Sequence, residues 1–443
     1  MLKVVLSLSI IGGFRFFGLF VVMPMLSIYV MKLEGGKIDS NIAGILIGLS
    51  VSSYAISQII FQIPFGILGD RFQKRHLIAI GLAIFSIGSF VCAFANSVEM
   101  IILGRLVQGS GAIGSLVSAN IVDLVKEEKR GYAMAFMGIM IFVSFILAMI
   151  IGPSIGVRFG VDRVFLLTAF LSLLSIVLLY LTIPKSPKLE YVKQKGSYKE
   201  LLKNKNILIL NISVLLQKFL MTFAFTIIPI MLIHHLNMLE KDIWKVFALS
   251  ALGGFIALMP GMIISEKFGR PKLVLIIAIV LFFSAYFIMN LGDKTSQLNL
   301  FIVGVILFFC AFCLQEPILQ NLASKYPKIY EKSLSLGIFT TFGFLGSFFG
   351  GIIGGALFDN SSFGSIILII CSLILCWGVL VFFLNDPINY ENLYLNLDSN
   401  DARKLDGLKG ILEHYINKSE NVLVIKFDKK EISKNEILEK VKI

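Results

Sequence analysis

The sequence predicts an all-α membrane protein with twelve transmembrane helices in two six-helix repeats, followed by a small soluble α+β domain. Of the 443 residues, 57% are hydrophobic and only 15% are charged, whereas about 25% of residues are charged in a soluble globular protein. After Asp386-Pro387 the chain becomes polar and highly charged. No soluble core needs so much apolar surface, so most of the chain is expected in lipid.

Twelve apolar stretches each approach the roughly 20 residues that a membrane-spanning helix needs. The longest break between them, residues 184–206, contains seven lysines and reads as a linker loop. It separates an N-terminal bundle, residues 1–183, from a second bundle, residues 207–387. We expect helices near 4–30, 42–67, 77–95, 98–123, 132–157, 163–183, 207–233, 243–264, 272–291, 298–323, 333–357 and 363–385.

Lys and Arg concentrate in every second connection, for example at Lys126, Lys129 and Arg130 and in the linker loop. Short loops rich in these residues lie on the cytoplasmic side of a membrane. Both termini are therefore expected in the cytoplasm of a bacterium, with the protein in the inner membrane. Membrane orientation also accounts for the net charge of +12, so no nucleic-acid partner is expected.

The two halves resemble each other where the second helix of each one ends. Residues 63–74 and 259–270 align Pro64 with Pro260, Asp70 with Glu266, and a basic residue and a Phe directly after each acid. Two parallel six-helix repeats with a substrate site between them near the midplane are a known transporter plan.

The stretch from Gly66 to Arg75 reads GILGDRFQKR and resembles the loop signature of the major facilitator superfamily, G-x-L-G/A-D-R-x-G-R-K. Gln73 stands where the family has Gly. The resemblance implies a conformational latch in which Asp70 clamps to groups around the end of the fourth helix. The alternative is that these charges serve only topology and helix capping. The predicted latch residues are Gly66, Asp70, Arg71, Lys74, Arg75, Asp123 and Arg130.

Two further motifs resemble this family. Residues 105–111 read RLVQGSG and match its R-x-x-Q-G-x-G pattern, and residues 152–156 read GPSIG and resemble the G-P-x-x-G motif of its antiporters, although Ala148 stands where Gly is usual. Gly and Pro there are expected to allow close packing and a kink against the other half of the protein. The predicted helix-packing residues are Gln108, Gly109, Gly111, Gly152, Pro153 and Gly156.

A closer resemblance rests on residues 15–20 with Pro24, on residues 61–66, on residues 314–317 and on the C-terminal segment. Together they resemble the YajR-type subgroup, which implies proton-driven, drug-efflux-like transport and a soluble C-terminal domain.

Four ionisable residues lie within the predicted spans, namely Arg15, Arg105, Lys218 and Glu316. Charges inside a membrane are costly and mark functional sites by default. Glu316 is the one carboxylate deep in a span, and burial disfavours its charged form, so it is the predicted protonation site. A fixed ion pair that joins helices is the alternative.

The three cations each have two possible roles. Arg105 either takes part in proton coupling or holds helices together through backbone carbonyls. Lys218 either pairs with Glu316 or extends to an edge of the membrane, and Arg15 binds an anionic substrate group or an acid.

The C-terminal segment, residues 388–443, alternates between strand and helix patterns in the order β-α-β-β-α, which is most of a ferredoxin-like unit. Strands are expected at 391–397, 412–417 and 422–427, and helices at 401–411 and 433–442, with Ser433 as N-cap. This segment has no Cys and a single His, and Cys310 and Cys313 lie in an apolar span without His or acidic neighbours. No metal or cofactor is expected. The domain could regulate transport, bind an ion, self-associate or only stabilise the protein.

The predicted function is proton-coupled export of small, amphiphilic molecules by alternating access, with a monomer as the transport unit. A metabolite symporter or uniporter, or a membrane sensor that does not transport, are the alternatives. No nucleophile with its base, metal cluster or phosphate-binding loop indicates an enzyme.

Overall fold

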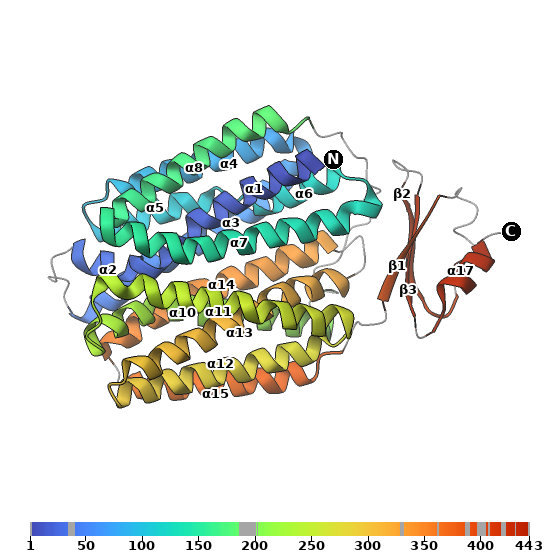
Figure 1. Cartoon of the computed structure of the whole chain (residues 1–443). Helices are drawn as coiled ribbons and strands as arrows, with labels where there is room; N and C mark the ends of the chain where they lie inside the picture. The colour runs from blue at the N-terminus through green and yellow to red at the C-terminus, as the bar shows by residue number, and fades with distance from the viewer. Residues whose placement is uncertain are drawn as a thin grey trace.

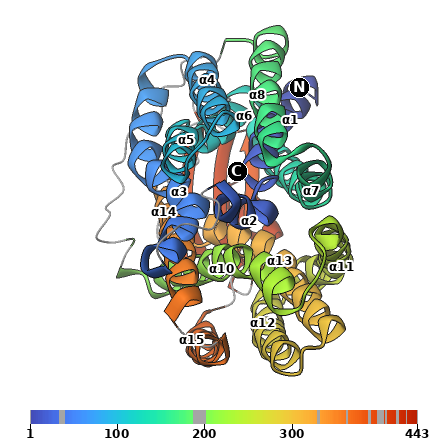
Figure 2. The same cartoon turned by 90° about the vertical axis from the view of Figure 1, so that its left-hand side faces the viewer.

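The computed structural model describes residues 2–33, 40–185, 201, 203–327, 332–360, 363–385, 390–396, 405, 408–417, 422–429 and 431–441. Within these ranges, twelve helical segments are long and apolar enough to cross a membrane, which confirms the predicted fold class. Figures 1 and 2 show them as two groups of helices, with a small sheet beyond one end of the bundle. We call this end the sheet-side end and the other end the opposite end.

The first half contains six spans, two of which are divided in the middle. Its helices are α1 (Leu2–Phe20), α2 (Met23–Leu33), α3 (Ser40–Arg71), α4 (Lys74–Ala93), α5 (Val98–Ser110), α6 (Gly114–Leu124), α7 (Glu127–Phe159) and α8 (Val161–Thr182). The second half has α10 (Lys205–Ile230), α11 (Ile243–Met262), α12 (Pro271–Lys294), α13 (Leu298–Lys325), α14 (Lys332–Asn360) and α15 (Phe363–Phe382). Short π-helical turns, Met231–His235 and Ile263–Lys267, extend α10 and α11.

The divided spans differ from the sequence prediction, which expects continuous helices there. The first span breaks between α1 and α2, and the fourth breaks between α5 and α6 at residues 111–113. A Cβ atom on Gly111 would collide with the backbone oxygen of Gly81. The break therefore lets α5 approach α4 closely and leaves backbone carbonyl groups of α5 without helical partners.

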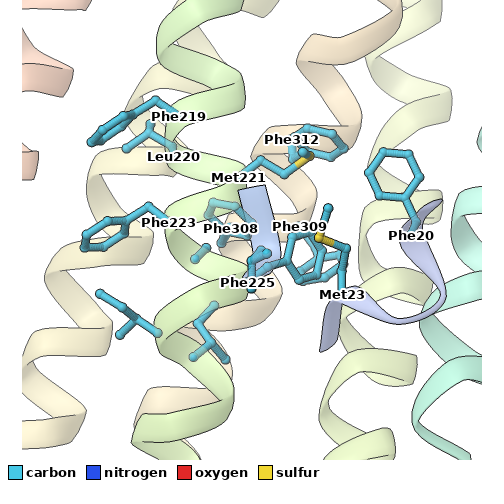
Figure 3. Close-up of a cluster of buried hydrophobic side chains, with 14 of the residues drawn as sticks. Phe20, Met23, Phe219, Leu220, Met221, Phe223, Phe225, Phe308, Phe309 and Phe312 are labelled. Atoms are coloured by element: carbon cyan, nitrogen blue, oxygen red, sulfur yellow. The ribbon is translucent and has the colours of Figure 1, made fainter. Parts of the chain in front are cut away.

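The halves contact each other through aromatic side chains near the middle of the spans. Phe145 on α7 packs against Phe309 and Phe312 on α13, with ring centroids 6.2 and 5.4 Å apart. Phe142 stacks on Phe255 of α11 at 6.4 Å. Figure 3 shows Phe309 and Phe312 within a larger cluster that includes Phe20 from the first half. Aromatic packing of this kind joins the halves without a fixed polar geometry.

A second contact between the halves runs along α3 and α14 toward the opposite end. Small residues repeat every fourth position on both helices, and we call them the α3–α14 seam. A Cβ atom on Gly48 would collide with the backbone of Gly351, and one on Gly355 would collide with that of Gly44. Small residues at such spacing allow helix backbones to approach closely in lipid. The seam residues are Gly44, Gly48, Ser52, Ser347, Gly351 and Gly355.

Toward the sheet-side end the same two helices are less tightly packed. A Cβ atom added to Gly66 on α3 or to Gly337 on α14 would meet no atom within 4 Å. Ile63 and Ile67 on α3 are 54% and 53% exposed. The structure is therefore closed at the opposite end and looser at the sheet-side end.

The C-terminal segment forms β1 (Tyr390–Asn396), β2 (Ile411–Asn417), β3 (Val422–Asp428) and α17 (Lys434–Val441). The strands form an antiparallel sheet in the order β1-β3-β2. Ser433 caps α17, because the Glu436 amide donates to its side chain at 3.3 Å while the Ser433 amide donates to Glu436 at 2.8 Å, which confirms the predicted N-cap.

The predicted helix at 401–411 is wrong at its end. Ile411 belongs to β2, and Gly410 has a φ of 93°, a conformation that ends a helix. Residues 401–404, 406 and 407 lie outside the described residues.

Candidate functional site

The structure brings together two of the four predicted intramembrane charges. The Lys218 ammonium on α10 donates to the Glu316 carboxylate on α13, with a distance of 2.8 Å between Nζ and Oε2. Their side chains are 18% and 21% exposed. Gln320, one helical turn further along α13, donates to the second carboxylate oxygen at 3.0 Å. Both members of the pair belong to the second half, and both are partly exposed.

The pair lies beside the aromatic contact between the halves. The Lys218 ammonium is 5.1 Å from the centroid of the Phe312 ring, and Phe312 in turn packs against Phe145 of the first half. A cation over an aromatic face gains electrostatic attraction. The charged pair and the aromatic groups that touch the other half therefore form one continuous site near the midplane.

Arg105 is fully buried within the first half. Its guanidinium donates to the Gln108 side chain at 3.0 Å and to the Val51 carbonyl oxygen at 3.2 Å, and it lies 4.7 Å from the Tyr54 ring centroid. The Gln108 side-chain amide in turn donates to the Ser89 hydroxyl at 2.8 Å. Neutral acceptors and an aromatic face thus hold this cation between α3, α4 and α5.

Arg15 is also buried, and it occupies the break between α5 and α6. Its guanidinium donates twice to the Gly111 carbonyl oxygen, at 2.6 and 3.1 Å, and lies 5.4 Å from the Phe85 ring centroid. A helix C-terminus presents unpaired carbonyl groups and a partial negative charge. Arg15 therefore serves as a cap for α5.

The predicted latch residues lie at the sheet-side end of the first half. The Lys74 ammonium and the Asp123 carboxylate are 2.5 Å apart. Arg75 donates to the Ile183 carbonyl oxygen at 3.0 Å, and Arg130 donates to the carbonyl oxygen of Val122 at 3.0 Å. These contacts tie α4, α6, α7 and α8 together within one half. Arg71 is exposed, and the side chain of Asp70 lies outside the described residues.

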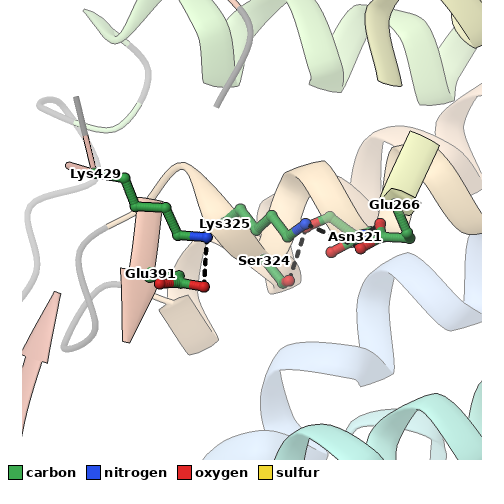
Figure 4. Close-up of polar contacts among 6 residues, drawn as sticks. All are labelled: Glu266, Asn321, Ser324, Lys325, Glu391 and Lys429. Atoms are coloured by element: carbon green, nitrogen blue, oxygen red, sulfur yellow. Dashed lines mark hydrogen bonds and ion pairs between the residues drawn. The ribbon is translucent and has the colours of Figure 1, made fainter. Parts of the chain in front are cut away.

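Figure 4 shows the equivalent region of the second half, where α11 and α13 end. Glu266, the counterpart of Asp70, accepts a hydrogen bond from Asn321 and lies 3.6 Å from the Lys325 ammonium. It thus links the end of α11 to the end of α13, which is the helix that carries Glu316.

The predicted packing residues contact neighbours inside the first half. A Cβ atom on Gly109 would collide with the Tyr54 backbone oxygen, and one on Gly152 would collide with that of Val21, at the break between α1 and α2. Gly156 approaches Met25 less closely, and Pro153 lies inside α7. In this structure Gly152 therefore packs against the divided first span, whereas the sequence predicts packing against the other half.

Sequence reasoning about charges missed the uncharged polar residues near these sites. Gln217 and Gln315, the residues before Lys218 and Glu316, are both fully buried. The Tyr54 ring of the first half packs edge to face against the Phe344 ring of the second half, with centroids 6.4 Å apart. The seam could have been found from the sequence, because its residues recur every four positions in both helices. Among the residues that the structure describes, no three His, Cys, Asp or Glu side chains form a group that could hold a metal ion.

Comparison with known proteins agrees with this architecture. The family model of the Major Facilitator Superfamily matches residues 8–244 and 219–396. The inner membrane transport protein YajR of Escherichia coli K12 is 32% identical over 444 aligned residues, which cover 97% of this chain and 95% of that protein. Multidrug resistance protein 1 of Bacillus subtilis 168 is 26% identical, over 72% of this chain and 82% of that protein.

Among solved structures, a D-xylose–proton symporter superposes with a TM-score of 0.71, at 17% identity, over 87% of this chain and 98% of its own. This likeness shows the shared fold. With the near full-length match to an inner membrane transport protein, the family model covering both halves and the twelve-helix fold, the chain belongs to the Major Facilitator Superfamily of transporters.

Proposed function

We propose that the protein is a proton-coupled antiporter that exports small, amphiphilic molecules across the bacterial inner membrane by alternating access. The sheet-side end faces the cytoplasm in this proposal, because the basic connections lie there. Both termini are then cytoplasmic, and a single chain is the transport unit. The partly exposed Lys218–Glu316 pair is the observation that carries the proposal.

Proton binding and the ion pair exclude each other at Glu316. In the structure, which is closed at the opposite end, the carboxylate accepts from Lys218 and Gln320. A proton arriving from outside would replace the bond from Lys218 and leave the ammonium over the Phe312 ring. Because the pair lies next to the aromatic contact between the halves, a change in its charge acts where the halves move apart.

The surroundings of the pair favour amphiphilic substrates. Phe145, Phe309 and Phe312 offer apolar faces, and the Lys218–Glu316 pair offers a charge of either sign. The relatives include a protein named for multidrug resistance, which supports the same substrate class.

The direction of dye movement under an imposed proton gradient tests this function. Purified protein in liposomes with an acidic lumen is expected to accumulate ethidium, a permanently charged dye that pH alone does not redistribute. A protonophore should abolish the accumulation. Accumulation only when the exterior is acidic would indicate symport, and dye binding without flux would indicate a sensor. Carboxyfluorescein in the same assay distinguishes anionic from cationic preference.

A further inference from the structure

Three buried phenylalanine rings meet between α10, α11 and α13. Figure 3 shows two of them, Phe225 and Phe309, side by side, and their centroids are 6.0 Å apart. The Phe247 centroid lies 6.1 Å from that of Phe225 and 6.0 Å from that of Phe309. None of the three side chains is more than 1% exposed. We call these three residues the ring cluster.

The ring cluster lies on the opposite-end side of the Lys218–Glu316 pair. Phe225 follows Lys218 by seven residues on α10, and Phe309 precedes Glu316 by seven residues on α13. Seven residues are about two helical turns, so each ring lies about 10 Å along the axis from the charged residue, on nearly the same helix face. Because α13 ends against the C-terminal sheet, Phe309 is farther from the sheet-side end than Glu316.

The exposure of the side chains falls between the pair and the ring cluster. Lys218 and Glu316 are 18% and 21% exposed, whereas the three rings are almost completely buried. Closely packed apolar side chains in a membrane protein exclude water, and with it the hydrogen-bonded path that a proton needs. The pair is therefore partly open, and the next level toward the opposite end is closed.

The first half of the protein completes this closed level at Phe309. The Phe145 ring on α7 packs against the Phe309 ring at 6.2 Å, and against the Phe20 ring on α1 at 5.1 Å. Phe309 thus touches rings of both halves. Separation of the halves removes the Phe145 ring from Phe309, and the ring contacts that remain have no fixed polar geometry and are free to rearrange.

We propose that the ring cluster is a hydrophobic seal, which keeps water and protons at the opposite end from reaching the Lys218–Glu316 pair until the halves separate. This inference rests on the proposed function and deepens it, because it assigns the side chains that control proton access to the pair. The rings act through their bulk and apolarity. They prevent a continuous path along which protons run through the protein without substrate.

Phe309→Ala tests the seal, because it removes the ring that contacts both halves. The full chain in liposomes, without substrate and under a potassium diffusion potential set by valinomycin, is expected to admit protons several-fold faster than the wild type. A pH-sensitive dye trapped in the lumen reads the proton entry. Phe225→Ala removes a second ring of the cluster and should show the same increase, so the test does not depend on the folding of one variant.

The matched control is Phe282→Ala. Phe282 is equally buried in the second half, where its ring packs against Phe308 at 5.5 Å and Trp377 at 6.0 Å. It loses the same side-chain volume outside the ring cluster, so proton entry should stay at the wild-type rate. Wild-type entry in both Phe309→Ala and Phe225→Ala, or an equal increase in Phe282→Ala, would overturn the proposal.

The double variant Phe309→Ala/Glu316→Gln tests what the seal protects. Proton entry is expected to return toward the wild-type rate, because the amide binds no proton at neutral pH. Entry as fast as in Phe309→Ala alone would overturn the assignment of the pair as the protected group. The assay contains no transported dye. A failure of the proposed antiport, seen as no ethidium accumulation by the wild type, is therefore distinct from a failure of the seal.

Discussion

The buried charges of this protein fall into two kinds. Arg15 and Arg105 are held by backbone carbonyl groups, an amide side chain and aromatic faces, which have no charge to lose. Lys218 instead binds Glu316, whose charge disappears when it takes up a proton. We therefore propose that the two arginines are fixed structural cations and that the Lys218–Glu316 pair is switchable. The sequence predicts the four charges, and it offers the Lys218–Glu316 pair and carbonyl partners for Arg105 as alternatives. It does not predict the Gly111 partner of Arg15, because a carbonyl group exposed by a helix break leaves no pattern in the sequence.

Lys218→Met tests whether the pair is switchable. Removing the cation leaves the Glu316 carboxylate without the ion pair that a proton would replace. Accumulation of ethidium driven by a proton gradient is therefore expected to fall, while dye binding is retained. Lys245→Met is the control, since Lys245 lies 2.6 Å from Asp242 at the exposed opposite end. Accumulation at the wild-type level in Lys218→Met would contradict the switch.

Arg15→Met tests the capping role of the second buried arginine. It leaves the Gly111 carbonyl oxygen without its donor at the break between α5 and α6. Loss of a hydrogen bond to a charged group costs about 1.5–3 kcal/mol, which should appear as a lower unfolding free energy in denaturant titration in detergent. Equal or greater stability would show that the cost of burying the guanidinium outweighs the value of the cap.

At the scale of the helices, composition and periodicity predict the number and type of elements but not their interruptions. The spans at 4–30 and 98–123 are long and apolar enough to be predicted as single helices, and their hydropathy does not place the breaks between α1 and α2 and between α5 and α6. Each break depends on a glycine packed against a backbone that is distant in sequence. Tertiary contacts decide such features, and a single sequence does not reveal them.

The close packing of the α3–α14 seam gives a prediction at the helix scale. Gly355→Ala places a methyl group against the Gly44 backbone, whereas Gly337→Ala on the same helix places one in open space. Gly355→Ala is expected to force the seam apart and raise deuterium exchange in residues 344–355. Gly337→Ala should behave as the wild type. Equal deuterium exchange in the two variants would show that this seam does not hold the opposite end closed.

At the scale of the whole molecule, the end of α13 contacts both the end of α11 and the C-terminal sheet. Glu266 connects it to the end of α11, and Lys426 of β3 donates to the carbonyl oxygens of Lys325 at 2.7 Å and Pro327 at 3.1 Å. An ammonium at a helix C-terminus is stabilised by the carbonyl groups and the dipole there. The C-terminal sheet thus contacts the helix that carries Glu316.

Lys426→Met tests this contact in the full chain. The variant is expected to raise deuterium exchange in residues 318–326 by about two- to ten-fold, the range for one lost hydrogen bond. Lys429→Met is the control, because the Lys429 ammonium lies 2.5 Å from Glu391 within the sheet and both side chains are half exposed. The same exchange in both variants would mean that the sheet does not hold α13.

The sequence predicted the whole-molecule plan more fully than the site. Twelve apolar spans, two halves and the β-β-α order of the C-terminal segment follow from patterns that repeat along the chain. The pairing of Lys218 with Glu316 depends on the packing of α10 against α13, and the contact of the Tyr54 ring with Phe344 depends on the packing of α3 against α14. Contacts between the halves exist in one conformation of the protein, and local sequence patterns do not specify which residues meet in it.

The central claim is that Glu316 couples proton movement to transport, and Glu316→Gln in liposomes tests it most directly. The amide keeps the shape of the side chain but binds no proton at neutral pH. Exchange of ethidium across the membrane without a gradient should persist, while accumulation driven by a proton gradient should be lost. Glu99→Gln, an exposed acid on α5, should retain both activities. Accumulation by Glu316→Gln at the wild-type level would contradict the account.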